Sequence, residues 1–193
     1  MRPFFKALPI ILLLLVAAGV GIGQILPDER TIARRLTIDA EPAEVFDRVG
    51  RIRGWSGWYV APDAEARFEG PEGSGGALVV VDENTGEERR LVLTETSSPS
   101  LAVYAFPQVE AMPFEIEGRF EIRPEGDGRA TVRSAQRLRG RAGGIFAQAG
   151  GRWFLAVLAP NLIGSILERE LHNLKAAVEG RPLPAAPAPP EAQ

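Results

Sequence analysis

The sequence predicts an α+β fold in which a strongly curved antiparallel sheet packs against a long C-terminal helix. Three observations support this class. Strand-like segments follow one another from Ala64 to Gly140, and a helical apolar stripe then runs from Trp153 to Val178. Two short helical segments precede most of the strands, at 41–46 and 50–58. A sheet with all its helices on one face is the common α+β arrangement.

The first 27 residues form a separate segment. Arg2 and Lys6 precede a run, Ala7 to Leu26, that has no charged side chain. About 20 apolar residues in a helix cover the hydrocarbon core of a bilayer. We interpret residues 1–27 as an N-terminal transmembrane helix, because the run exceeds the ~7–15 residues of a typical export signal and no A-x-A cleavage site follows it. The alternative is an export signal.

The charges around this segment predict its orientation. Arg2 and Lys6 lie before the apolar run, and Asp28 and Glu29 lie after it. The positive-inside rule then places the N-terminus in the cytoplasm and the rest of the chain on the far side. We therefore expect a single-pass protein of the inner (plasma) membrane that contacts the membrane through residues 7–26. Its domain would lie outside the cell or in the periplasm.

Composition limits the rest of the chain to one domain. Without the anchor and the C-terminal tail, about 150 residues are left, enough for a single core of ordinary size. We assign this domain to residues 28–179. The tail, residues 180–193 (GRPLPAAPAPPEAQ), is rich in proline and alanine and is expected to be disordered. A net charge of −3 argues against binding to nucleic acid. The oligomeric state is left open.

The elements of the domain are justified in chain order. Arg34 to Asp39 alternates as a strand does, and Pro42 suits the first turn of a helix that starts at Glu41. Gly50 to Trp58 is helical or turn-like. Further strands are expected at 67–69, 77–81, 88–96, 101–106, 112–123 and 129–139, with turns at 70–76, 84–86, 97–100 and 124–128. Pro160 marks a kink or a new start in the last helix, which Gly180 and Pro182 end.

The two late strands indicate which side chains face the helix. In 112–123, one face carries Phe114, Ile116, Phe120 and Ile122, and the other carries charges. In 129–139, Ser134 and Gln136 share a face with Val132 and Leu138, so they are polar groups that point inward. A buried polar group needs a partner. Either each one bonds nearby backbone or water, or the two bond a mostly apolar ligand.

Aromatic residues and the helical stripe allow two interpretations in the same way. Trp55, Trp58 and Tyr59 follow the second short helix and either fill the core or line a pocket mouth. The stripe of the last helix, from Leu155 to Leu174, is core by default, and it would also cover any cavity beneath it.

Catalytic signals are few. His172 is the single histidine and the chain has no cysteine, so a zinc site of His and Cys ligands is not expected. The glycine-rich stretch 70–76 (GPEGSGG) lacks the Lys-Ser/Thr of a phosphate-binding loop and fits a hairpin turn. We expect no catalytic residue, no metal and no cofactor. The arginines at 133, 137, 139 and 141 either form a solvated strand face or face anionic lipid headgroups.

Several strings resemble the START-like superfamily of helix-grip domains (SRPBCC), in particular its polyketide cyclase/dehydrase-like family. Ile38 to Phe46 (IDAEPAEVF) is similar to the opening strand and helix, and Trp55 with Trp58 matches a frequent W-x-x-W turn. Gly118 to Val132 resembles the paired late strands. Glu168 to Glu179 resembles the closing helix, except that Glu170 stands where the family often has glycine. The resemblance covers roughly residues 33 to 179.

This resemblance implies a helix-grip fold, with a cavity between the sheet and the last helix. We therefore expect a membrane-tethered domain that binds a hydrophobic small molecule or lipid. The candidate ligand-binding residues are Trp55, Trp58, Tyr104, Phe114, Ile116, Phe120, Ser134, Gln136, Leu158, Leu162 and Ile166.

Two alternatives stay open. One is an enzyme of the cyclase, dehydratase or hydrolase kind that uses Ser134, Gln136 and Tyr104, with His172 a more distant addition. The other is a non-catalytic interaction domain with a filled core. A cavity filled by side chains would count against ligand binding.

Overall fold

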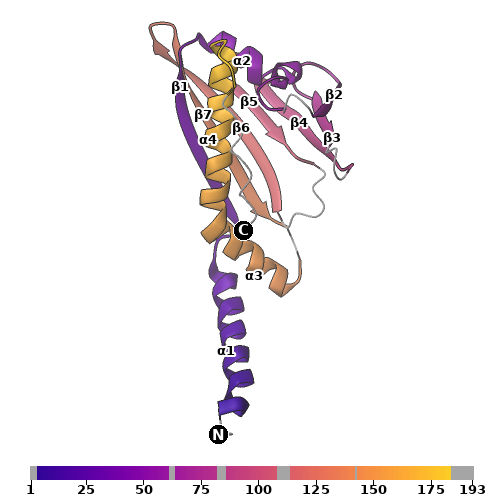
Figure 1. Cartoon of the computed structure of the whole chain (residues 1–193), viewed down its shortest axis with the longest axis vertical. Coiled ribbons are helices and arrows are strands. Elements are labelled where there is room, and N and C mark those ends of the chain that lie inside the picture. The colour runs from indigo at the N-terminus through magenta and orange to yellow at the C-terminus, as the bar shows by residue number, and fades with distance from the viewer. Residues whose placement is uncertain (1–3, 61–63, 82–85, 108–113, 142, 184–193) are drawn as a thin grey trace.

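The computed structural model describes residues 4–60, 64–81, 86–107, 114–141 and 143–183, and Figure 1 shows the arrangement of its elements. The first half of the order is α1 (Phe4–Ile25), β1 (Glu29–Ile38), α2 (Pro42–Val49), the 3-10 turn η1 (Ile52–Trp55), β2 (Glu65–Glu69), β3 (Ala77–Val81) and β4 (Glu88–Ser97). The second half is β5 (Leu101–Ala105), β6 (Phe114–Gly126), β7 (Arg129–Gly140), α3 (Ile145–Trp153), the π-helical turn η2 (Phe154–Leu158) and α4 (Ala159–Val178).

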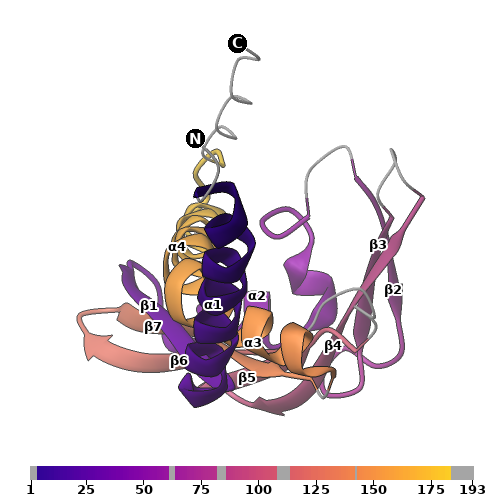
Figure 2. The same ribbon diagram turned by 90° about the horizontal axis from the view of Figure 1, so that it is seen from below.

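The seven strands found among the described residues form one antiparallel sheet in the order β1-β7-β6-β5-β4-β3-β2. Figure 2 shows this sheet curving around the helices, with β1 and β7 at one side and β2 and β3 at the other. The predicted α+β class and the expected number of strands are confirmed. β1 begins at Glu29, earlier than the predicted Arg34. The sequence pattern missed the first residues of the strand because arginines interrupt the apolar alternation there. One of them, Arg34, faces α4 and pairs with Glu168 at 2.6 Å.

The turns predicted at 70–76 and 97–100 are present, and the turn predicted at 124–128 is shorter, because Pro124, Glu125 and Gly126 belong to β6. Gly126, Asp127 and Gly128 all have positive φ and join β6 to β7. The stretch 70–76 joins β2 to β3, as expected for a hairpin. The first two residues of the turn expected at 84–86, and the first two of the strand expected at 112–123, lie outside the described residues.

α2 and η1 place the aromatic side chains over the inner face of the sheet. The Glu44 carboxylate accepts a hydrogen bond from the Glu41 backbone N–H at 3.2 Å, and Pro42 fits the first turn. The buried face of α2 consists of Val45, Phe46 and Val49. The helical or turn-like character expected for Gly50 to Trp58 is confirmed by η1.

The C-terminal helical segment begins at Ile145, earlier than the predicted Trp153, and Pro160 lies in the first turn of α4. The side chains that face the sheet are Leu155, Ala159, Ile163, Leu167, Leu171 and Leu174. Leu158 and Leu162 are 59% and 53% exposed. This corrects the predicted stripe, because a π-helical turn adds residues to one turn and changes which side chains face the sheet. A site between sheet and helix therefore does not include Leu158 or Leu162.

α1 extends away from the sheet (Figure 1). Its apolar part, Ile10–Ile25, is shorter than the length required of a membrane-crossing helix. Among the described residues, the helix that meets that length and composition is Ile145–Val178, which packs on the sheet as a core element. The transmembrane helix predicted for residues 1–27 is thus not supported by helix length and stays a prediction. The predicted tail lies mostly outside the described residues, although Leu183 packs against the core.

Tyr104 lies flat across its neighbour strand. Its partner in the register is Gly118 on β6, and the next residue in the same row is Gln136 on β7. A Cβ atom at Gly118 would overlap the Tyr104 ring. Only glycine at 118 therefore lets the Tyr104 hydroxyl reach across β6 to Gln136.

We predict that Gly118→Ala lowers the free energy of unfolding by about 1–3 kcal/mol, because the added methyl group overpacks a closed site. Urea unfolding monitored by tryptophan fluorescence would measure it. Gly150→Ala is the matched control, since a Cβ there meets nothing within 4 Å and alanine is the better helix former. Equal stability of the two variants would contradict the predicted crossing of Tyr104 over β6.

Candidate functional site

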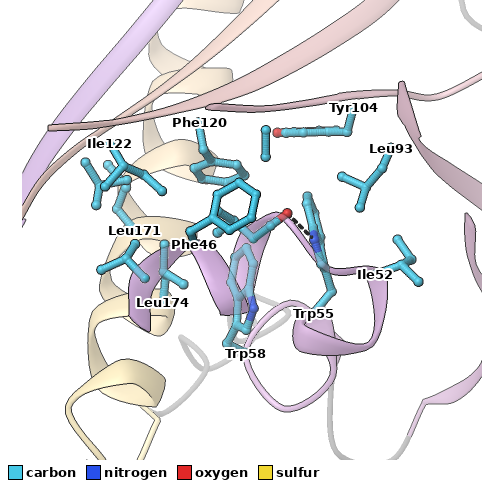
Figure 3. Close-up of a cluster of buried hydrophobic side chains, with 14 of the residues drawn as sticks. Phe46, Ile52, Trp55, Trp58, Leu93, Tyr104, Phe120, Ile122, Leu171 and Leu174 are labelled. Carbon is cyan, nitrogen blue, oxygen red and sulfur yellow. Dashed lines mark hydrogen bonds between the residues drawn. The ribbon is translucent and has the colours of Figure 1, made fainter. Parts of the chain in front are cut away.

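The inner face of the sheet is covered at one end by an aromatic cluster centred on Trp55 (Figure 3). The Trp55 ring lies 5.2 Å from Trp58, 5.1 Å from Tyr104 and 5.8 Å from Phe120, centroid to centroid. Both indole N–H groups are satisfied by backbone. Trp55 Nε1 donates to Val49 O and Trp58 Nε1 donates to Gly54 O, each at 2.9 Å. These contacts are those of core aromatics with paired polar atoms.

Four of the predicted ligand-binding residues belong to this cluster. Trp55, Tyr104 and Phe120 are fully buried and Trp58 is 1% exposed. Ile122, Leu171 and Leu174 pack beside them. Side chains fill the space at this end of the molecule, as the core-packing interpretation expects. A ligand between sheet and helix would have to lie toward the other end.

At that other end the apolar side chains are less closed. Phe114 stacks on Phe154 with ring centroids 5.1 Å apart and planes 6° apart. Phe114, Ile116 and Ile166, all predicted site residues, are partly buried, and so is Phe106. Phe106 in turn lies 5.7 Å from Tyr104, which connects this region to the aromatic cluster.

Polar groups lie on the inner face where the two regions meet. Gln136 Nε2 donates to Tyr104 Oη at 3.2 Å. Ser134, one inward position away on β7, is fully buried, and among the described residues its Oγ atom has no hydrogen-bond partner. The inward direction predicted for Ser134 and Gln136 is confirmed. Gln136 bonds the side chain of Tyr104, and not backbone or water as the first interpretation has it, while Ser134 Oγ is left for the second.

Glu170 adds a buried carboxyl group to this region from α4. It is 9% exposed, and its Oε2 atom has no partner among the described residues. Burial raises the pKa of Glu170 to about 7, and the nearby Arg169 opposes that rise only in part. Burial, followed by the charge of Glu170, also raises the pKa of Tyr59 and of Tyr104. Tyr59 and Tyr104 are therefore neutral donors at neutral pH, and Glu170 is about half protonated there.

Sequence reasoning did not select Glu170 as a site residue and noted it only as a departure from the family pattern. A second signal was available. Glu170 lies three residues after Leu167 and next to Leu171, on the buried side of α4. Glutamate is rarely buried in proteins unless it is paired, so a glutamate inside an apolar helical stripe is a candidate functional residue.

Other candidate residues lie elsewhere. His172 is exposed, and its Nδ1 atom is 2.7 Å from Glu168 O, so it takes no part in the interior cluster. A depression of about 330 Å³ lies on the outside, where Glu44, Asp47, Arg48, Gly54 and Val178 meet. Within the described ranges, no group of three or more His, Asp or Glu side chains is placed to hold a metal ion.

The arginines of β7 lie on the outer face of the sheet. Arg133 pairs with Glu121 at 3.0 Å and Arg137 pairs with Glu29 at 2.6 Å. This agrees with a solvated strand face. The pairs are half exposed, so each contributes little to stability.

A curved antiparallel sheet closed by a C-terminal helix defines a helix-grip domain. The family model described as "Polyketide cyclase / dehydrase and lipid transport" matches residues 29–179. The chain belongs to this family, within the SRPBCC superfamily that the sequence predicted.

Solved structures share the fold at low identity. Norcoclaurine synthase from Thalictrum flavum, in complex with dopamine and hydroxybenzaldehyde, is 14% identical, with a TM-score of 0.60 over 82% of this chain and 91% of that one. A protein from Thermobifida fusca is 19% identical, with a TM-score of 0.57 over 78% and 93%. One from Chromobacterium violaceum is 16% identical, with a TM-score of 0.51 over 77% and 96%. Comparison with curated proteins returned no match.

The raised pKa of Glu170 makes stability depend on pH. The folded state holds this proton more tightly than the unfolded state, whose carboxyl titrates near 4.5. The folded state therefore carries more protons between about pH 4.5 and 7, and stability falls as pH rises through that window. The loss is on the order of 3 kcal/mol, since each pKa unit corresponds to about 1.4 kcal/mol.

We predict that Glu170→Gln removes most of this loss, so that the variant is more stable than the parent at pH 8 and similar to it at pH 5. Urea unfolding at the two pH values would measure it. Glu115→Gln, on the exposed face of β6, is the control and should keep the parent's pH dependence. The same pH dependence in Glu170→Gln and the parent would show that Glu170 is not the titrating group.

Proposed function

We propose that this domain binds a hydrophobic small molecule or lipid between the sheet and α4. The observation that carries the proposal is the pair of polar atoms Ser134 Oγ and Glu170 Oε2, which are buried and have no hydrogen-bond partner in the part of the chain that the structure describes. Leaving a buried polar atom unpaired costs about 1–3 kcal/mol. A ligand with one polar end would satisfy these atoms and recover that free energy.

The apolar wall of the proposed site adjoins its polar end. Ile166 and Glu170 are four residues apart, so they share one face of α4. The facing side consists of Phe114 and Ile116 on β6 and Phe106, which directly follows β5, and all three are partly accessible. A mostly apolar lining with a few convergent polar groups is typical of small-molecule sites. The closed Trp55 cluster would form the floor of the site.

We also propose that residues 7–26 anchor the domain in the inner (plasma) membrane, with the N-terminus cytoplasmic and the domain outside or periplasmic. The uncharged run supports this anchoring. The apolar side chains of α1 from Ile10 to Val16 also support it, because each of them is 47–69% exposed. Large exposed apolar surfaces mark contact with a membrane or a partner. Such an anchor would hold the ligand site next to a source of lipid.

The ligand proposal predicts that the full chain, extracted in detergent and incubated with membrane lipid extract, retains a ligand in native mass spectrometry. Ser134→Ala should reduce the ligand-bound fraction, because it removes one of the two polar atoms that the ligand would satisfy. Thr131→Val, on the outer face of the same strand, should leave that fraction unchanged. A parent protein that retains nothing from the extract would refute the proposal.

One observation favours the enzyme alternative as a second candidate. A carboxyl group with a pKa of about 7 can donate or accept a proton near neutral pH. Glu170 would then act with Tyr104, and Ser134 and Gln136 would orient the substrate. Dehydration or hydrolysis would change the mass of a ligand bound to the parent protein with time, and cyclisation without loss of water would change its chromatographic retention, while Glu170→Gln would hold the ligand unchanged. A ligand with unchanged mass and unchanged retention in the parent protein would leave binding alone as the function.

The anchor proposal predicts that the protein recovered from membrane fractions begins at or next to Met1 and resists extraction by alkaline carbonate. Sequencing of the mature N-terminus would measure the first, and carbonate extraction the second. A mature chain that begins after residue 27 would show that the segment is an export signal.

A further inference from the structure

α3, η2 and the first turn of α4 expose an unusual set of apolar side chains. The exposed ones are Ile145 (55%), Phe146 (68%), Trp153 (39%), Val157 (54%), Leu158 (59%) and Leu162 (53%). Between residues 143 and 167 the only charged side chain is that of Arg152. Phe146, Trp153 and Val157 are spaced by seven and four residues, so they lie along one side of the helix. Single exposed apolar residues are ordinary, but a continuous group is not.

α3 lies against the last turns of α1. Gly23 approaches Ala149 so closely that a Cβ at Gly23 would lie 2.7 Å from the Ala149 Cβ. Trp153 Nε1 donates to Gly19 O at 3.0 Å, and Gln24 Nε2 donates to Ile145 O at 3.2 Å. The end of α3 therefore lies beside Gly19, and its start lies beside Gln24. Figure 1 shows both helices at the same end of the domain.

These contacts fix the depth of α3. Gly19, Gly23 and Gln24 all belong to the uncharged run of residues 7–26. Any bilayer that holds this run also surrounds or borders the helix packed against its last turns.

The polar groups at the junction of α1 and α3 are paired. The Arg152 guanidinium donates to Gln24 O, at the C-terminal end of α1, where a cation is favourable for the helix dipole. Arg30 Nη1 donates to Ala156 O at 3.1 Å. The Trp153 indole combines a half-exposed ring with a satisfied N–H, the arrangement that tryptophan adopts at membrane interfaces.

We propose that α3, with η2 and the first turn of α4, is a second membrane-contacting element. It lies at the headgroup–acyl boundary and inserts Phe146, Trp153 and Val157 beside α1. This inference rests on the proposed anchoring of α1. A lipid bilayer is favoured over a protein partner because the surface continues the exposed apolar surface of α1 and contributes almost no charge of its own. Interfacial helices bury their apolar face ~5–10 Å into this boundary.

This placement has a consequence for the ligand site. Phe154 follows Trp153 directly and stacks on Phe114, at the less closed end of the inner face. The element in contact with lipid is therefore continuous with the less closed end of the inner face. A lipid chain would pass from the bilayer to the interior along Phe154 without crossing water.

The absence of cysteine from the sequence makes the experiment direct. Single cysteines would replace Leu13 in α1, Phe146 and Val157 on the proposed surface, Ser165 on the exposed side of α4, and Glu95 on β4. All five positions are exposed, so the fold should tolerate them. Each full-length variant would carry a nitroxide label in vesicles of phosphatidylethanolamine and phosphatidylglycerol. Collision rates with oxygen, which partitions into lipid, and with a water-soluble nickel complex report the depth of the label.

We expect labels at 146 and 157 to show a higher ratio of oxygen to nickel collisions than the labels at 165 and 95. A lipid-like ratio at 13 with water-like ratios at 146 and 157 would overturn this inference and leave the anchor intact. A water-like ratio at 13 would overturn both. Dipolar broadening between copies at 146, with no rise in oxygen collisions, would identify a second copy of the chain as the occupant and overturn the lipid proposal.

Discussion

The structure depends on the packing of Trp55 between the curved sheet and the helices. Its ring contacts those of Trp58 and Tyr59, from the segment after η1, and those of Tyr104 on β5 and Phe120 on β6. A sheet this curved leaves a concave face that must be filled at crystal-like density. The aromatic cluster fills one end of it, and any site between sheet and α4 is therefore limited to the other end.

The buried polar groups lie at the boundary between the filled end and the less closed end of the concave face. Tyr104 belongs to the cluster through its ring and to the polar group through its hydroxyl, because Gly118 lets it cross β6 to Gln136. Glu170 reaches the same region from α4, and burial raises its pKa to about 7, so that about half of it is protonated at neutral pH. A neutral carboxyl group costs less to bury than a carboxylate and still offers a donor and an acceptor. That combination suits binding of a polar group and, with a suitable ligand, proton transfer.

The packing of α1 on α3 links the N-terminal segment to the domain. Without these contacts the position of α1 would not be related to the position of the candidate site. With them, under the proposed anchoring, the depth of the apolar run in a bilayer would determine the depth of α3, and Phe154 would extend that relation to the inner face of the sheet. The π-helical turn between α3 and α4 gives this helical segment one face that packs on the sheet and one exposed apolar face. Leu155 points inward there, while Leu158 and Leu162 point outward.

The sequence by itself determined the fold class, the order of elements, the hairpin turns and the inward direction of Ser134 and Gln136. Strand alternation, proline and glycine are local signals, and they hold wherever one face of the sheet is buried. Only the tertiary structure decided which aromatics fill the core, that Leu158 and Leu162 face outward, and that Glu170 is buried. These outcomes depend on the phase of a helix after a π turn and on which strand lies opposite it. Both are set by contacts between residues far apart in the chain, which no local pattern contains.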